Sequence, residues 1–269
     1  MLNAQSTAAR FSAAAEILRR KPLYLATRAT IRVTAEAECL VLRGTGSQVR
    51  RFPVARLDRI VCNRHADWSG EALALCLARG ITVTWLGADG RALGDCSPRL
   101  AEPSTLHAAL ESYLEMPRWT ASYGNWLRRR RMALLIRWAR GRLAAGTGIS
   151  RDQWETLKRE FVYKGTMQPT LTAELPGWCH ALVVARLKDA GLHTRYWGYD
   201  GEALELAEDL SALLWAGMNL DWGTLMGAAR EPKAQAMALE AAMDGQIERI
   251  RDHLAHLRRH VAQALDSWL

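Results

Sequence analysis

The sequence predicts an α+β protein in which a small N-terminal β-rich domain is followed by a larger all-α domain. Short apolar or alternating runs separated by turn residues occupy residues 22–98, whereas long helical patterns occupy residues 105–269. The composition changes between them, at Ser97-Pro98 and again at Glu102-Pro103-Ser104. We therefore expect one domain over residues 1–100, of which 1–20 form an N-terminal extension, and a second over residues 105–269.

The first domain is expected to hold several short strands and one helix. The runs that predict strands are 23–25, 31–34, 39–42, 48–50, 59–62 and 81–86. The turn-prone segment Gly44-Thr45-Gly46-Ser47 lies between the third and fourth runs and favours a hairpin. Ser69 can cap a helix over residues 71–79, which Gly80 ends.

The second domain is expected to be helical throughout. Its periodic segments predict helices at 106–115, 123–145, 150–163, 172–190, 202–214 and 234–269. Gly146-Thr147-Gly148 and Gly191 interrupt the pattern and mark helix ends.

Composition excludes several classes of protein. With 49% hydrophobic and 24% charged residues in 269, the chain has the composition of a globular protein and enough length for a real core. No window approaches the roughly 18 apolar residues that a membrane span needs, and residues 1–20 do not resemble a secretory signal. The five cysteines are odd in number and form no CxxC pair, which argues against a disulfide scaffold and fits a reducing cytoplasm.

The net charge of +8 is unevenly distributed. Residues 118–164 hold 12 basic and 3 acidic side chains, whereas residues 165–269 hold 9 basic and 14 acidic ones. An arginine-rich block of this kind predicts contacts with DNA phosphates, although a solvated surface is the alternative. The expected DNA-binding residues are Arg128, Arg129, Arg130, Arg131, Arg137, Arg140, Arg142, Lys158 and Lys164.

Four tryptophans are interleaved with these basic residues: Trp119, Trp126, Trp138 and Trp154. Tryptophan can stack on an unpaired base, but packing in the core or at a dimer interface is the interpretation that we favour.

Within residues 20–98 the order of several short motifs is informative. The motifs are Lys21-Pro22-Leu23-Tyr24-Leu25, Arg51-Phe52-Pro53, Leu57-Asp58-Arg59-Ile60-Val61, Asp67-Trp68-Ser69-Gly70-Glu71-Ala72-Leu73, Ala78-Arg79-Gly80-Ile81-Thr82-Val83-Thr84-Trp85-Leu86 and Asp89-Gly90-Arg91. In this order they resemble the N-terminal β domain of the CRISPR-associated spacer-acquisition integrases, also called CRISPR adaptation endonucleases. The resemblance implies a β domain that dimerises and is followed by a helical catalytic domain.

The helical half is similar to the family at two places. The segment 178–192 ends in Ala190-Gly191-Leu192, like the family helix before its catalytic segment, and residues 203–210 are similar to a family stretch whose aspartate matches Asp209. The family's catalytic glutamate lies on an earlier helix, where Glu155 is best placed and Glu160 is the alternative. The family's catalytic histidine has no match, because the corresponding region reads Tyr196-Trp197-Gly198-Tyr199-Asp200.

The resemblance implies a metal-dependent endonuclease and integrase that inserts short DNA duplexes into a repeat array by attack of a 3′-hydroxyl. It implies Mg²⁺ or Mn²⁺, a homodimer, double-stranded DNA and a small dimeric partner protein. The expected catalytic residues are Asp209, Glu155 and His193, and the expected metal ligands are Asp209, Glu155, Glu205 and Asp200. The missing histidine supports the alternative of a catalytically degenerate member that serves as a DNA-binding or structural subunit.

Two sets of residues at helical spacing could hold a metal. Glu202, Glu205 and Asp209 follow at i, i+3 and i+7, so one face of a helix could gather three carboxylates. An ordinary solvated acidic face is the alternative. His253, His256 and His260 have the same spacing on the last helix, but the arginines around them favour a titratable basic face over a zinc site.

Overall fold

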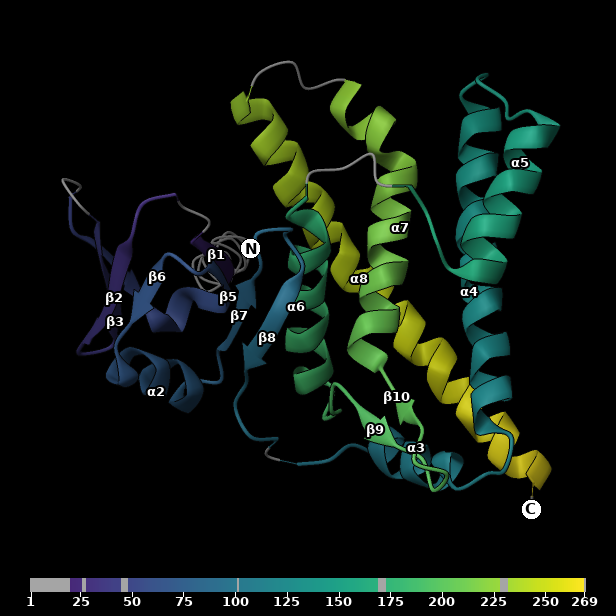
Figure 1. The fold of residues 1–269 in the computed structure, drawn as a ribbon, viewed down its shortest axis with the longest axis horizontal. Helices are drawn as coiled ribbons and strands as arrows, with labels where there is room; N and C mark the ends of the chain where they lie inside the picture. Colours follow the sequence, from purple (N-terminus) through teal and green to yellow (C-terminus); the bar gives the residue numbers. More distant parts are fainter. Residues whose placement is uncertain are drawn as a thin grey trace, which may run out of the picture. The chain divides into compact units, whose positions relative to one another are not determined.

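The computed structural model describes residues 20–25, 28–44, 48–100, 102–168, 173–227 and 232–268. It confirms the α+β class, with a β-rich region before a helical one (Figure 1). The chain divides into two compact units, Met1–Arg99 and Leu100–Leu269. Residues 1–19 of the expected N-terminal extension, and the centre of the expected turn at 45–47, lie outside the described residues.

The described residues of the N-terminal unit form two four-stranded sheets and one α-helix. One sheet has the order β1-β5-β7-β8 and the other the order β4-β3-β2-β6. The elements are β1 Lys21–Leu25, β2 Ile31–Glu36, β3 Cys39–Gly44, β4 Arg50–Pro53, β5 Leu57–Asn63, β6 Ala66–Trp68, α2 Gly70–Ala78, β7 Thr82–Leu86 and β8 Ala92–Cys96, with a 3₁₀ turn at Val54–Arg56.

Local signals in the sequence account for the best-predicted parts of this unit. Strands β3 and β4 pair antiparallel, as the expected hairpin requires. The Ser69 hydroxyl accepts a hydrogen bond from the Ala72 amide at 3.2 Å, so Ser69 caps α2 as predicted. Strands β6 and β8 were not predicted, because the first is only three residues long and the second is largely exposed and contains Gly94 and Asp95, which are uncommon in strands.

The C-terminal unit is a helical array with one small hairpin (Figure 1). Its elements are α3 Thr105–Leu114, α4 Trp119–Ala144, α5 Arg151–Leu157, the π-helix η2 Lys158–Lys164, α6 Leu175–Asp189, β9 Tyr196–Trp197, β10 Ala203–Leu204, α7 Leu206–Gly227 and α8 Pro232–Trp268. The expected helix beginning at residue 202 is wrong in its start, because residues 203–204 pair with β9 and α7 begins only at Leu206. Glu202 and Glu205 therefore do not share a helix with Asp209.

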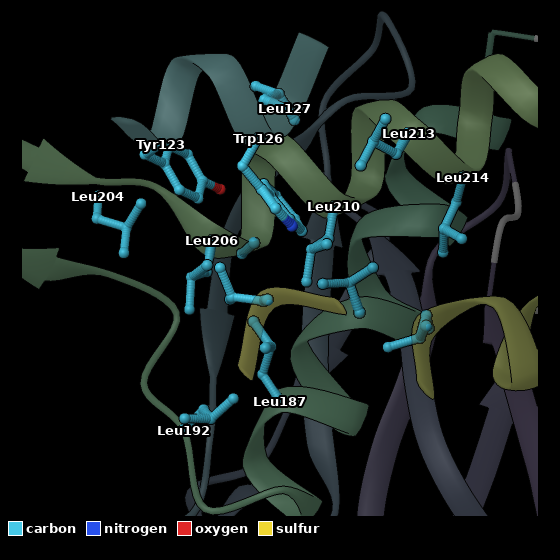
Figure 2. Packing of buried hydrophobic residues seen from close by; sticks show 14 of the residues in the cluster. Tyr123, Trp126, Leu127, Leu187, Leu192, Leu204, Leu206, Leu210, Leu213 and Leu214 are labelled. Atoms are coloured by element: carbon cyan, nitrogen blue, oxygen red, sulfur yellow. The ribbon is translucent and has the colours of Figure 1, made fainter. Parts of the chain in front are cut away.

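Helix α6 is apolar and buried along most of its length. Residues 179–185 are all buried, and the cluster around them includes side chains from α3, α4, α7 and α8. Figure 2 shows part of this cluster, where Tyr123 and Trp126 of α4 lie near Leu206 and Leu210 at the start of α7. The core therefore fixes the relative positions of the helices that carry the predicted site.

The glycine of Ala190-Gly191-Leu192 has a structural role. Gly191 adopts a left-handed φ of 66°, and a Cβ at this position would lie 2.9 Å from the Glu102 carbonyl oxygen and the Ser104 amide. The Gly191 carbonyl also accepts a hydrogen bond from the Ser104 amide at 3.1 Å. This glycine therefore allows the start of the helical unit to pack against the end of α6.

All five cysteines are free thiols. No helix in the described part of the chain is long and apolar enough to cross a membrane.

Candidate functional site

Helix α4 carries seven of the predicted DNA-binding arginines, and the structure divides them into two groups. Arg128, Arg129, Arg137 and Arg140 are exposed, whereas Arg130, Arg131 and Arg142 are partly buried. The inward positions of the helix are taken by aromatic and aliphatic residues such as Trp119, Tyr123 and Leu135. The three partly buried arginines lie next to these inward positions on the helix.

Three of the exposed arginines lie on one face of α4. At about 100° per residue, Arg129, Arg137 and Arg140 fall within about 80° of one another and span about 16 Å along the axis. Partial burial lowers the pKa of Arg137, and so does the positive charge of Arg249 on α8. Arg249 itself forms an ion pair with Asp221 at 3.5 Å, which offsets part of its positive charge. We call Arg129, Arg137 and Arg140 the α4 arginine face.

Arg130 links α4 to α8 and is not free for DNA. Its Nε donates a hydrogen bond to His253 Nδ1 at 3.0 Å, and its guanidinium forms an ion pair with Asp252. Placing Arg130 among the DNA contacts therefore conflicts with its position. Its contacts instead hold the helix that presents the α4 arginine face.

The last helix does not present three histidines on a basic face. His253 is buried, at 2% exposed, and only His256 and His260 are partly accessible. His260 Nε2 lies 3.2 Å from the Tyr113 hydroxyl. Burial, followed by the charge of Arg130, lowers the pKa of His253 to about 3. His253 is thus a neutral hydrogen-bond acceptor.

Acidification from pH 7 to pH 5 is expected to reduce the free energy of unfolding by about 2 kcal/mol through His253 alone. The unfolded chain takes up a proton as the pH falls below the ordinary histidine pKa of 6.5, whereas folded His253 stays neutral until about pH 3. The contribution is therefore complete above pH 6.5 and is lost progressively below it. Urea unfolding at both pH values should show a smaller difference for His253→Gln, which keeps an acceptor for Arg130. Equal losses in the two proteins would contradict this account.

The remaining predicted basic contacts have partners within the chain. Lys164 pairs with Glu160 at 3.0 Å, and Lys158 lies 3.8 Å from Glu155. Arg142 donates to the Gly148 carbonyl at 3.2 Å and lies over the Trp138 ring. Exposed ion pairs of this kind are weak, so Lys158 and Lys164 can still exchange their partners for phosphates.

Asp209 lies near the start of α7, half-buried against α4. Burial raises the pKa of its carboxyl, while the Tyr123 hydroxyl and the Arg131 guanidinium act in the opposite direction. The Tyr123 hydroxyl is buried and makes no hydrogen bond of normal geometry. The Arg131 guanidinium packs closely against Gly165. A Cβ added at Gly165 would lie 2.8–2.9 Å from the guanidinium atoms. The Arg131 guanidinium is therefore a positive charge of the protein that acts on the Asp209 carboxyl.

The other predicted acidic residues have separate partners. Glu205 forms an ion pair with Arg195 at 2.6 Å, and Asp200 Oδ1 accepts a hydrogen bond from Trp119 Nε1 at 3.2 Å. Glu155 is exposed on α5 beside Lys158. Each of these three carboxylates therefore has a different hydrogen-bonding or ion-pairing partner.

His193 is exposed in the segment between α6 and β9. Its ring contacts those of His107 and Tyr196, at centroid distances of 5.3 and 5.9 Å, and its amide donates to the Tyr196 hydroxyl. No carboxylate among the predicted ligands contacts it. His193 therefore stands in an aromatic cluster and apart from Asp209.

The divalent metal that the resemblance implies does not fit this arrangement. Among the residues that the structure describes, no three histidine, cysteine, aspartate or glutamate side chains come together in a group that could hold a metal ion. All of the predicted ligands are within that part of the chain. Asp209 is instead influenced by Arg131, a fixed cation, and a divalent ion there would meet charge repulsion.

The four tryptophans of the basic block belong to the core, as we favoured from the sequence. Trp119 and Trp126 are buried, and Trp138 and Trp154 pack against the same cluster. None of the four is among the well-exposed large hydrophobic residues. Base stacking, if this unit performs it, requires other aromatic side chains.

Sequence reasoning missed two features of the site. Arg249 approaches the α4 arginine face from a helix more than 100 positions away, and no local signal could place it there. The β9–β10 hairpin exposes Trp197 and Tyr199, at 65% and 92%. The alternation of buried Tyr196 with exposed Trp197 was a possible signal, but it is too short to predict a strand.

Taken together, the fold and the site define a two-unit α+β protein with an exposed basic helix and a half-buried carboxylate on α7. Residues 23–121 match the family model described as CRISPR associated protein Cas1. The match covers the β unit and the start of the helical unit, and it agrees with the resemblance that the motifs of the β unit carry.

Solved structures share the fold of this chain. A CAS1 protein from Thermotoga maritima is 14% identical, with a TM-score of 0.65 over 90% of this chain and 97% of that one. A casposase bound to its integration product is 13% identical, with a TM-score of 0.53 over 86% of this chain and 82% of that one. No curated protein sequence matches the chain.

Proposed function

We propose that this protein is a DNA-binding subunit of a CRISPR adaptation assembly that performs no metal-dependent strand transfer of its own. The α4 arginine face carries the proposal, because it places three exposed arginines on one side of a helix. Its length of about 16 Å equals the rise of about five base pairs along the axis of a DNA duplex. The match of residues 23–121 to the Cas1 family model and the integration product held by the similar casposase support DNA as the ligand.

We propose no strand transfer by this chain because the predicted catalytic residues do not come together in one site. Burial raises the pKa of Asp209 against the opposing effects of Tyr123 and Arg131, while Glu155 and Glu205 pair with basic residues elsewhere. The chain would then contribute DNA binding to the assembly. The homodimer and the small dimeric partner protein implied by the family are part of this proposal.

An active integrase is the second candidate. It is favoured by the Cas1 match and by the position of Asp209 on the helix that follows Ala190-Gly191-Leu192. In this function the protein inserts short duplexes into a repeat array by 3′-hydroxyl attack, with Mg²⁺ or Mn²⁺ as cofactor.

Binding and strand-transfer assays on the full chain separate the two functions. We expect the wild type and Asp209→Asn to bind a 30-base-pair duplex equally in EDTA, because the proposed contacts are arginines. We also expect no joining of a labelled duplex to supercoiled plasmid in Mg²⁺ or Mn²⁺, with or without the partner protein. Metal-dependent joining by the wild type that Asp209→Asn abolishes would overturn the proposal in favour of the integrase.

A further inference from the structure

Helix α8 places three histidines along its contact with α4. His253, His256 and His260 follow at i, i+3 and i+7, so they share one face of α8 and span about 10 Å along its axis. His260 Nε2 lies 3.3 Å from Ser122 Oγ near the start of α4, whereas His253 accepts from Arg130 further along α4. The two helices therefore run in opposite directions where they pack together (Figure 1).

The three histidines differ in their access to solvent. His253 is buried and stays neutral as the acceptor of Arg130. His256 and His260 are partly exposed, and 43% of the His256 side chain is accessible. Of the three rings, only those of His256 and His260 can therefore meet a ligand from solvent.

The contacts of His260 define where it takes up a proton. The Tyr113 hydroxyl of α3 donates to the Trp119 carbonyl at 3.2 Å, so it accepts from His260 Nε2, which lies 3.2 Å away. Nε2 therefore carries the hydrogen of the neutral ring, and Nδ1 is the atom that gains the second proton. Burial, followed by the charge of Arg129 on α4, lowers the pKa of His260, so the ring is neutral at pH 7.

His256 lies among charges of both signs. Its Nε2 is 3.5 Å from Asp252 Oδ1, but the other oxygen of this carboxylate is paired with Arg130. Partial burial, followed by the charge of Arg130, lowers the pKa of His256, and Arg259 acts in the same direction, whereas Asp252 opposes them. His256 is therefore also neutral at pH 7 and becomes a cation at lower pH.

The two histidines adjoin the α4 arginine face. At about 100° per residue, Ser122 lies two turns before Arg129 and within about 20° of it around α4, so His260 contacts the same side of the helix. The neutral neighbours of His260 are Tyr113 and Ser122, and Asp252 is the acidic neighbour of His256. A phosphate brought here by the arginines would therefore favour the protonated form of both rings.

We propose that His256 and His260 extend the DNA-binding surface from α4 onto α8 and that they bind phosphates in their protonated form. The inference rests on the proposed function, because it takes the same DNA as ligand. Since bound phosphate stabilises the imidazolium ions, DNA binding is coupled to proton uptake. The affinity for DNA then rises as the pH falls, although the phosphodiesters keep their charge over this range.

Binding of a duplex of about 30 base pairs to the full chain, in EDTA and at about pH 7.5 and about pH 5.5, tests the extension. We expect the wild-type affinity to be about tenfold higher at the lower pH, because each ring takes up part of a proton. The slope of log K against log salt should become steeper by up to about 2, because two more phosphates are neutralised. His256→Gln/His260→Gln should lose most of both changes and keep the wild-type affinity at the higher pH.

Two controls accompany this comparison. His65→Gln removes an imidazole from the β unit and should keep the full response to pH. Urea unfolding of the wild type and the double variant at both pH values shows whether each protein remains folded during the binding measurements. Glutamine retains a donor for the Tyr113 hydroxyl, so we expect the double variant to fold.

Each contrary outcome has a definite meaning. Equal wild-type affinity at the two pH values would overturn the extension and leave the proposed function intact. The same would follow if the folded double variant responded to pH as strongly as the wild type, or if it lost the same fraction of its affinity at both pH values. Failure of the wild type to bind the duplex at either pH would refute the proposed function itself.

Discussion

Replacing Arg129, Arg137 and Arg140 together with glutamine is expected to lower the affinity for a DNA duplex by about 100-fold at physiological salt. Each arginine that neutralises a phosphate releases counterions on binding, so the slope of log K against log salt should become shallower by up to about 3. Fluorescence anisotropy at four salt concentrations measures both quantities. The three side chains are exposed or at the surface of α4, so the fold should be retained.

A matched control comes from the β unit. Arg32, Arg50 and Arg56 are also exposed, and their replacement with glutamine removes the same net charge. We expect this control to reduce affinity only slightly, through the lower overall charge. Equal losses in the two triple variants would show that the total charge attracts the DNA and would contradict a specific role of the α4 arginine face.

The second large effect is expected at Arg131. Arg131→Gln should lower the free energy of unfolding by about 1 kcal/mol, because it removes a positive charge that favours the ionised form of the half-buried Asp209 carboxyl. In Arg131→Gln/Asp209→Asn neither member of the pair is charged, so part of that loss should be recovered. Urea unfolding of the wild type, the two single variants and the double variant gives the coupling energy.

Arg128 provides the control for this cycle. It lies three residues earlier on α4, is exposed and bonds only to nearby Asn125 in the contacts that the described residues make. The effects of Arg128→Gln and Asp209→Asn on the free energy of unfolding should be additive in the double variant. A coupling energy near zero between Arg131 and Asp209 would mean that Arg131 does not stabilise the Asp209 carboxylate. Charge repulsion by Arg131 would then not oppose a metal ion at Asp209.

The fold was predictable where the signals are local. Ser69 before an apolar run, and the turn residues between two alternating segments, predicted the cap of α2 and the β3–β4 hairpin. The predicted start of α7 was wrong. Residues 203–204 fit a helical pattern, but they form β10 and pair with β9, and helical spacing does not reveal this contact. Tertiary pairing overrides local preference in short segments of this kind.

The site was predictable only in part, for the same reason. The sequence shows that arginines are concentrated on one helix, but not that Arg130 bonds to His253 more than 100 residues away. The sequence also shows clustered carboxylates but not their basic neighbours. In the structure Glu205 pairs with Arg195, although its charge still raises the pKa of Asp209. Residue type and spacing suggest candidates, and the packing of α4, α7 and α8 decides among them.

The salt dependence of DNA binding by the wild-type protein in EDTA tests the central claim most directly. If the exposed arginines bind the DNA backbone without a metal, the affinity should fall steeply with salt, with a slope of about −3 or steeper. A flat dependence, or binding that appears only when a divalent metal is added, would contradict the account.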